Sequence, residues 1–190
     1  MRLAPESTAL GVSPVMSHRD MPQRDVEAPA RRRGRLLVVA FILIAGLRLF
    51  ALHPTSISSE SMDPTLHRGD VVLIDTLSPR LGRDPGRGDL VTFTSPADGK
   101  PTLKRVVGVA GDRVRIADGV LVVNDRNVSE PYVDQASIDA LYWGTVTVPP
   151  AHVVVLGDRR AGSIDSRTYG PVPLTALSGR VLLRLWPPRS

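Results

Sequence analysis

Only two of the 24 basic residues in this 190-residue chain are lysines, and one of them, Lys104, stands in a run of β-branched residues. The difference between lysine and arginine matters chemically. The guanidinium group of arginine keeps its proton in a protein, whereas the ammonium group of a lysine removed from water can lose it. Strand alternation places Lys104 on the face opposite Leu103 and Arg105. Burial, with a minor contribution from the charge of Arg105, would lower its pKa and leave a proton-accepting amine. Composition by itself still favours a surface lysine, because structural groups outnumber catalytic ones.

An amine of this kind needs a hydroxyl group to activate, and the serine-rich segment 56–66 contains several. A serine in such a turn normally closes or caps a loop. The segment directly follows an apolar stretch, however, which suits a nucleophile that acts at a bilayer surface. A Ser-His-Asp triad stays open on residue counts alone.

Several other chemistries find no support in the sequence. The absence of cysteine excludes disulfides, thiol nucleophiles and cysteine-ligated zinc. The four histidines are scattered without metal-ligand spacing. The sequence also lacks a G-x-S-x-G, S-x-x-K or H-E-x-x-H motif and a glycine-rich phosphate loop. We therefore expect neither a metal nor a cofactor.

The net charge of +5 is concentrated near the N-terminus. Residues 31–35 contain a cluster of arginines, whereas residues 53–190 are nearly neutral with interspersed signs. Proteins that bind nucleic acid more often spread basic residues among aromatic ones over a folded face. Aromatic residues make up only 4% of this chain, so we expect no nucleic-acid partner.

The arginine cluster precedes an apolar stretch, residues 36–52, that is interrupted only by Arg48. This length is at the short end of what crosses about 30 Å of hydrocarbon as a helix. Basic residues before the stretch predict a single-pass anchor at 31–52, with the N-terminus in the cytoplasm and the rest outside the cell membrane. A cleaved signal peptide is disfavoured by Arg48 and by the lack of a small-x-small site. A buried core helix would not need the neighbouring arginines.

The remaining chain divides into a tail and one domain. Residues 1–30 are rich in Pro, Ser and acidic residues without periodicity, which predicts a flexible cytoplasmic tail. From residue 70 onward, short β-branched runs alternate with turn residues and predict an extracytoplasmic all-β domain over 53–190. The predicted strands are 71–75, 90–94, 103–109, 113–116, 120–124, 145–148, 152–156 and 180–185. Asp118-Gly119 predicts a hairpin turn, and residues 125–144 predict a surface excursion.

Several segments, in a fixed order, carry a resemblance to a known family. Ser61-Met62-Asp63-Pro64-Thr65-Leu66 resembles the S-M-x-P-T-L motif of type I signal peptidases (leader peptidases, serine peptidase family S26). Residues 68–72 and 87–93 resemble its R-G-D box, 104–112 its K-R-V-x-G-x-x-G-D box, and 157–167 its G-D-N-R-x-x-S-x-D-S-R box. Ordered motifs over residues 54–170 are far more specific than any one of them.

The resemblance implies a membrane-anchored serine endopeptidase that removes signal peptides from exported precursor proteins after an Ala-x-Ala sequence. Its domain would be a coiled antiparallel β-sheet, or partly open barrel, and its partners precursor proteins and the lipid bilayer, with the enzyme a monomer. Ser61 would be the nucleophile and Lys104 the general base. Ser59 would donate to the oxyanion and Ser163 would orient the lysine amine. Charged residues would support the site: Arg105, Asp158, Arg160, Asp165 and Arg167.

Substrate recognition is implied by the same resemblance. Residues 55–58 and 101–103 resemble the strands that receive the substrate as an added β-strand. The apolar candidates for pockets that admit only small side chains are Ile57, Met62, Leu66 and Leu103.

The chain departs from the family pattern at two places. Glu60 replaces the usual Gly before the nucleophile, and Ser58 replaces a common Pro. If that Gly is needed for a positive φ, Glu60 costs about 1–2 kcal/mol. In the last box Arg159, Ala161 and Gly162 replace Asn, an acidic residue and Asn. These changes bear on specificity and local stability more than on activity.

Three alternatives stay open. A self-cleaving Ser-Lys peptidase of the repressor type conflicts with the predicted anchor and with the lack of preceding DNA-binding helices. A dedicated peptidase for one conjugation or spore-coat substrate is compatible with every motif above. From a different class, an inactive membrane-anchored β-module could bind peptides by strand addition.

Overall fold

The computed structural model describes residues 28–186, and the predicted tail at residues 1–30 lies almost wholly outside them. The chain separates into two units, with the boundary after Ile42. Helix α1, Ala28–Ala51, covers nearly all of the predicted anchor. Its large apolar side chains from Leu36 to Ile44 are each more than half exposed. Within the described residues, no helix combines the length and the apolarity that crossing a bilayer requires.

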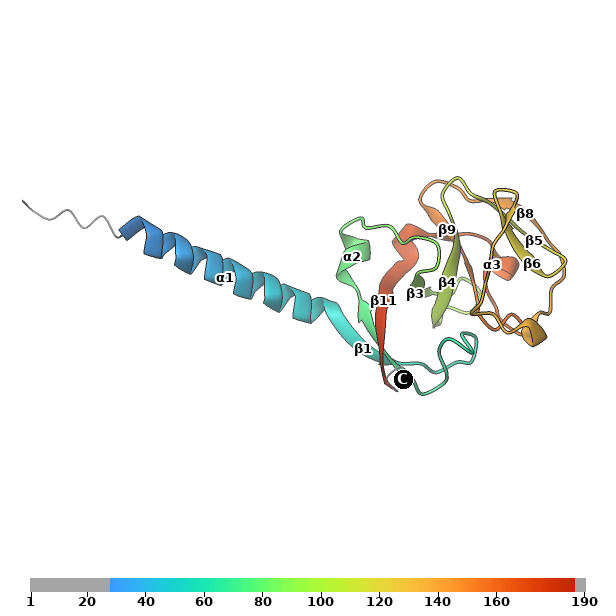
Figure 1. The fold of residues 1–190 in the computed structure, drawn as a ribbon, viewed down its shortest axis with the longest axis horizontal. Helices are drawn as coiled ribbons and strands as arrows, with labels where there is room; N and C mark the ends of the chain where they lie inside the picture. The colour runs from blue at the N-terminus through green and yellow to red at the C-terminus, as the bar shows by residue number, and fades with distance from the viewer. Residues whose placement is uncertain (1–27, 187–190) are drawn as a thin grey trace, which may run out of the picture. The chain divides into compact units, whose positions relative to one another are not determined.

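The unit that follows Ile42 is built from two antiparallel sheets (Figure 1). The larger sheet has the strand order β1-β2-β11-β3-β4-β9-β10, and the smaller one has the order β7-β6-β5-β8. The larger sheet contains β1 Leu52–Ser56, β2 Val71–Asp75, β3 Leu90–Thr94, β4 Pro101–Val109, β9 His152–Leu156, β10 Val172–Pro173 and β11 Leu177–Trp186. The smaller sheet contains β5 Arg113–Ala117, β6 Val120–Val123, β7 Arg126–Asn127 and β8 Trp143–Thr147.

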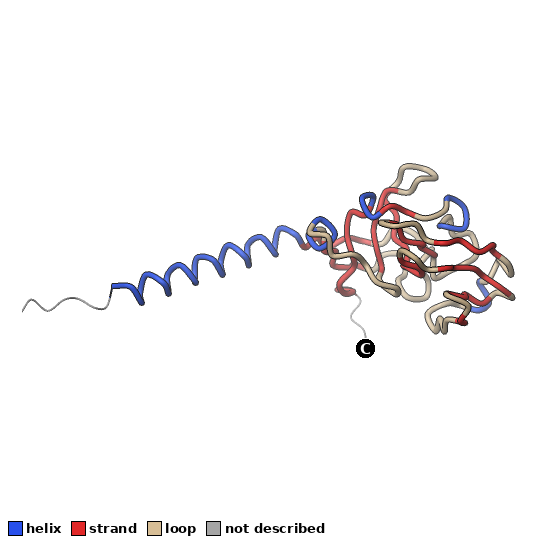
Figure 2. Tube along the Cα trace, turned by 90° about the horizontal axis from the view of Figure 1, so that it is seen from above, coloured by secondary structure: helices blue, strands red, loops and turns tan. Residues whose placement is uncertain are grey.

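Helical structure in this unit beyond α1 is limited to short turns between strands (Figure 2). These turns are α2 Leu77–Arg80, η1 Gln135–Ser137, α3 Ser166–Tyr169 and η2 Leu174–Ala176. The structure therefore confirms the predicted antiparallel β architecture. Within residues 28–186 the larger sheet does not close into a barrel, because β1 and β10 remain its two edges.

Each predicted strand overlaps an observed one, and β2, β3 and β9 have the predicted bounds. Three observed strands have no counterpart among the predicted ones. β1 contains Pro54, which lacks a backbone N–H and is tolerated because β1 lies at a sheet edge. β7 and β10 have two residues each, too few to produce a periodic pattern.

The predicted hairpin between β5 and β6 is confirmed. Ala117 pairs with Val120, so Asp118 and Gly119 form a two-residue turn. Both turn residues have positive φ, 51° and 76° respectively. Such a turn matches the right-handed twist of the flanking strands, and Asp-Gly tolerates it at little cost.

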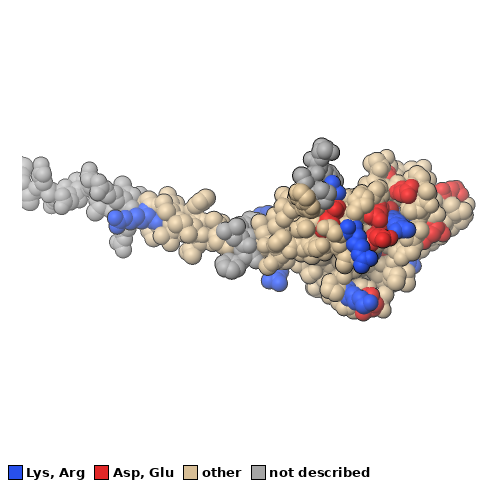
Figure 3. All heavy atoms as spheres, turned by 90° about the horizontal axis from the view of Figure 1, so that it is seen from below, with Lys and Arg blue, Asp and Glu red and all other residues tan. Residues whose placement is uncertain are grey.

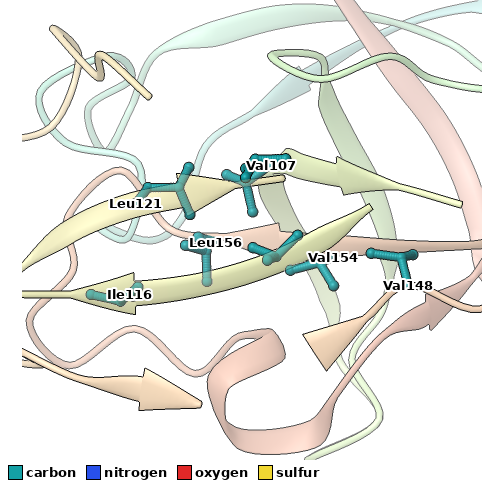
Figure 4. Packing of buried hydrophobic residues seen from close by; sticks show 8 residues of the cluster. Val107, Ile116, Leu121, Val148, Val154 and Leu156 are labelled. Carbon is teal, nitrogen blue, oxygen red and sulfur yellow. The ribbon is translucent and has the colours of Figure 1, made fainter. Parts of the chain in front are cut away.

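The smaller sheet packs on the larger one through an apolar cluster (Figure 4). Val154 and Leu156 of β9 contribute to it from one side, and Ile116 of β5 and Leu121 of β6 from the other. Gly108 allows the close approach, because a Cβ at this position would overlap a valine side chain of β5. This packing holds β4, the strand that carries Lys104, against the smaller sheet.

Candidate active site

Ser61 and Lys104 meet in the structure although 43 positions separate them, and Lys104 Nζ lies 2.6 Å from Ser61 Oγ. Lys104 stands on β4 with 3% of its surface exposed, while its neighbours Leu103 and Arg105 are half-buried. The predicted strand alternation is therefore observed. Ser61 lies in the loop between β1 and β2, residues 57–70, which we call the 57–70 loop.

The 57–70 loop is held at its base and in its interior. Backbone hydrogen bonds from Ile57 N to Asp70 O and from Gly69 N to Ile57 O, both 2.8 Å, close its two ends. Met62, the residue after Ser61, is completely buried. Leu66, also buried, donates its backbone N–H to Met62 O at 2.9 Å. The part of the loop that follows Ser61 is thus anchored in the core.

Burial is the largest influence on Lys104 and lowers its pKa below the usual 10.5. The carboxylates of Asp165 and Asp158 act in the opposite direction, and the positive charge of Arg167 adds to the lowering. The expected contribution of Arg105 is therefore replaced by that of Arg167. The guanidinium of Arg105 is instead bonded to Asp158.

The two supporting hydroxyl groups lie at different places around this pair. Ser59 Oγ is 3.3 Å from Ser61 Oγ on the exposed side of the loop. Ser163 Oγ is buried and has no hydrogen-bond partner among the described residues, so the expected bond to Lys104 is not formed. The Ser163 side chain packs instead where a Cβ of Gly157 would stand, and that position is 2.8 Å from Ser61 O.

The predicted charged residues form ion pairs that brace residues 157–167, which we call the 157–167 loop. Asp165 accepts a hydrogen bond of 2.9 Å from Arg167 Nε and one of 3.1 Å from Gly157 N. Asp158 accepts bonds of 2.8 and 2.6 Å from Arg105. Arg160 is 2% exposed and bonds Glu130 Oε1 at 2.6 Å.

Three further residues of this bracing come from the excursion 125–144, where no sequence motif marks them. Glu130 pairs with Arg160, and Asp139 accepts a 2.6 Å bond from Arg167. The ring of Tyr132 lies 3.9 Å from the guanidinium carbon of Arg105. The predicted surface excursion is therefore joined to the 157–167 loop by one buried pair and one partly exposed pair, and to β4 through Tyr132.

A groove of about 600 Å³ opens beside the Ser61–Lys104 pair. Its walls include residues 55–59 on one side and 100–104 on the other. Two of the four apolar candidates, Ile57 and Leu103, line this groove. Met62 and Leu66 do not line it, because their side chains are buried in a cluster with Val72 of β2 and its neighbours.

Glu60 does not carry the strain that a required positive φ would impose, because it is not among the residues with positive φ. Its carboxylate pairs instead with Arg159, with Oε2 2.6 Å from Nη1. Within residues 28–186, no group of three or more His, Cys, Asp or Glu side chains is placed to hold a metal ion. The site can thus supply a hydroxyl group, a buried amine and an adjacent hydroxyl donor.

Comparisons with known proteins find a matching family model and several similar proteins. The family model described as signal peptidase, peptidase S26, matches residues 30–186. A relative from Synechocystis sp., "Probable signal peptidase I-2", is 40% identical over 161 residues, or 81% of this chain and 72% of the relative. The "Mitochondrial ATP-independent inner membrane protease subunit 1a" of Arabidopsis thaliana is 38% identical over 141 residues, 73% of each chain. A signal peptidase I crystal structure from Enterococcus faecalis V583 is 33% identical, with a TM-score of 0.46 covering 53% of this chain and 97% of that one.

Proposed function

The chain belongs to the signal peptidase family, peptidase S26, and we propose that Ser61 and Lys104 are the dyad with which this serine endopeptidase removes signal peptides. The observation that carries the proposal is the 2.6 Å separation between Lys104 Nζ and Ser61 Oγ. At this distance a neutral amine can take the hydroxyl proton directly. Burial of Lys104 supports the neutral form.

The first half of the reaction forms an acyl-enzyme. Ser61 Oγ attacks the scissile carbonyl carbon while its proton moves to Lys104 Nζ. The negative charge on the carbonyl oxygen is received by Ser61 N–H and the Ser59 hydroxyl. Lys104 then gives its proton to the leaving amine as the C–N bond breaks. The mature protein departs, and the signal peptide remains esterified to Ser61.

The second half repeats these steps with water. Lys104, neutral again, takes a proton from a water molecule as its oxygen attacks the ester carbon. The same donors receive the oxyanion. When the ester bond breaks, the proton on Lys104 passes to Ser61 Oγ, and the signal peptide leaves with a new carboxyl group that gives its proton to solvent. Ser61 and Lys104 are regenerated, and each turnover consumes one water molecule and one peptide bond of the precursor.

We propose that the substrate binds in the groove as an added β-strand. On β4, the pairing with β9 covers Arg105–Val109, so residues 101–104 have no β9 partner on the edge that lies beside the groove. Backbone hydrogen bonds to this edge and to residues 55–58 would hold the peptide. We propose that Ile57 and Leu103, which line the groove, form the pockets that admit only small side chains, as in Ala-x-Ala.

We further propose that residues 31–52 attach the enzyme to the cell membrane. The rest of the chain, residues 53–190, which we call the catalytic unit, would then lie outside the cytoplasm. The support is the arginine cluster at 31–35 and the exposed apolar side chains of α1. We also propose that the enzyme acts as a monomer in which Ser61, Lys104 and the groove belong to the same chain.

The test is cleavage of a precursor with an Ala-x-Ala site by the full-length protein. Wild type should cut it, at a rate that rises as the pH rises through the lowered pKa of Lys104. Ser61→Ala and Lys104→Ala should each lose roughly 10³-fold or more in kcat while remaining folded. Comparable cutting by Lys104→Ala would remove this residue as the base, and an intact precursor with wild type would favour a peptide-binding module.

A further inference from the structure

An ion pair joins two positions at which the chain departs from the family pattern, Glu60 and Arg159. Arg159 Nη1 lies 2.6 Å from Glu60 Oε2. The backbone N–H of Arg159 also donates a 3.2 Å hydrogen bond to Ser61 O. One residue of the 157–167 loop therefore contacts both Ser61 and the residue before it.

Asp158, which precedes Arg159 in the 157–167 loop, contacts the residue next to Lys104. Asp158 accepts hydrogen bonds of 2.8 and 2.6 Å from Arg105. Arg105 directly follows Lys104 on β4. Two consecutive residues of one loop thus hold the neighbour of Ser61 and the neighbour of Lys104.

We propose that the Glu60–Arg159 pair is a clasp that fixes the position of Ser61 Oγ relative to Lys104 Nζ, with Arg159 as a positioning residue. This inference rests on the proposed function of Ser61 and Lys104. The clasp holds the side of the 57–70 loop that precedes Ser61. The side that follows Ser61 is already fixed by the buried Met62.

The preceding side has few other restraints. Ser58, Ser59 and Glu60 are all exposed. Within the described residues, the backbone groups of Ser58 and Ser59 take part in no hydrogen bond. Without the clasp, the backbone of residues 58–60 keeps only the bond from Asp63 N to Glu60 O within the described part of the chain, so the chain leading into Ser61 is held less tightly.

The clasp is expected to affect the rate far more than the stability. An exposed ion pair contributes little to folding, because water and salt screen it. Proton transfer, in contrast, depends steeply on geometry, and a displacement of about 1 Å can cost up to roughly 10²-fold in rate. The two ion pairs beside the site also differ in exposure. The Glu60 and Arg159 side chains are 57% and 44% exposed, whereas those of Asp158 and Arg105 are 1% and 11% exposed. Added salt should therefore weaken the exposed Glu60–Arg159 pair more than the buried Asp158–Arg105 pair.

The experiment measures kcat, KM and the melting temperature of the full-length enzyme on an Ala-x-Ala precursor at low and high salt. The variants are Glu60→Gln, Arg159→Gln and the exchange Glu60→Arg/Arg159→Glu. Each single variant should lower kcat about two- to fivefold, with KM and melting temperature unchanged and the salt dependence of kcat lost, because an exposed pair worth up to about 1 kcal/mol can shift the population of the productive geometry by no more than this. The exchange should restore most of kcat and the salt dependence.

The matched control is Arg113→Gln, which breaks an exposed pair with Asp125 on the smaller sheet, 3.1 Å across. It should leave kcat and its salt dependence unchanged. Wild-type kcat in both single variants, or an exchange variant no better than the singles, would overturn the clasp while the proposed function stands. A change in KM that follows the charge of the substrate residue after the cleavage site would also overturn it, because Glu60 would then contact substrate. A wild-type enzyme that cuts no precursor overturns the proposed function and the clasp together.

Discussion

Burial of Lys104 favours the proposed reaction but lowers the stability of the folded protein. The residue is 3% exposed, and burial is the largest cause of its lowered pKa. An ammonium group is poorly solvated there, so the folded state favours the amine that can accept a proton. The same effect lowers the free energy of unfolding at every pH below 10.5, because the unfolded lysine is protonated there and the folded site disfavours the proton.

Lys104→Met should therefore stabilise the protein at neutral pH by about 1–4 kcal/mol, the range seen when buried ion pairs are replaced by well-packed apolar residues. The unfolded lysine keeps its proton up to the usual pKa of 10.5, whereas the folded one loses it at a lower pH. Wild-type stability thus rises with pH between these two values, and the advantage of Lys104→Met shrinks over the same window. Urea unfolding at a series of pH values measures the difference.

The matched control is Lys100→Met at the other lysine, whose side chain is 80% exposed. This variant should change the free energy of unfolding by less than about 0.5 kcal/mol at any pH. A Lys104→Met protein that is less stable than wild type at neutral pH would show that the charged form is well accommodated.

At the scale of elements, the 57–70 loop is an extension of the core as well as a carrier of Ser61. Met62 and Leu66 are buried with Ile57, Val72 and Ile74 in one apolar cluster. The cluster attaches the loop to β2, which pairs with both β1 and β11. A residue adjacent to the proposed nucleophile therefore serves stability directly.

Met62→Ala should lower the free energy of unfolding by about 2–5 kcal/mol, because it removes a fully buried side chain and leaves a cavity. It should also reduce kcat, since the side of the loop that follows Ser61 loses its anchor. Denaturant unfolding and the precursor assay measure the two effects. Leu182→Ala on β11, where the leucine is 45% exposed, should change neither by much. Wild-type stability in Met62→Ala would mean that the loop is held by its backbone bonds alone.

The sequence predicted those elements whose pattern is local. β2, β3 and β9 are short β-branched runs bounded by turn residues, and the bounds predicted for them are those observed. β1 was missed because Pro54 and its polar neighbours resemble a loop. The partnership of Ser61 and Lys104 rested on motif order, since no periodicity relates residues so far apart. Glu130 could not be identified, because its role depends on where the excursion folds back.

The structure of the whole catalytic unit explains why its charge gives little information about partners. Basic and acidic side chains lie next to one another on the face shown in Figure 3. Many are paired, among them Arg180 with Asp89 and Arg184 with Asp70. The excess positive charge of the chain lies instead at 31–35, before the apolar stretch. Only this asymmetry bears on how the chain is oriented at a membrane.

A reporter that is active only outside the cytoplasm should therefore be active when it is fused after Ser190. A reporter that is active only in the cytoplasm should be inactive at the same position. The reason is that arginines at 31–35 resist translocation, while the nearly neutral unit after residue 52 does not. Replacing the arginines at 31, 32, 33 and 35 with glutamine should measurably raise the fraction of molecules whose C-terminus lies in the cytoplasm. Arg113→Gln, which removes an arginine from the folded unit instead, should not change this fraction. Cytoplasmic reporter activity with the wild-type chain would contradict the proposed orientation, and it would also separate Ser61 from precursors on the outer face.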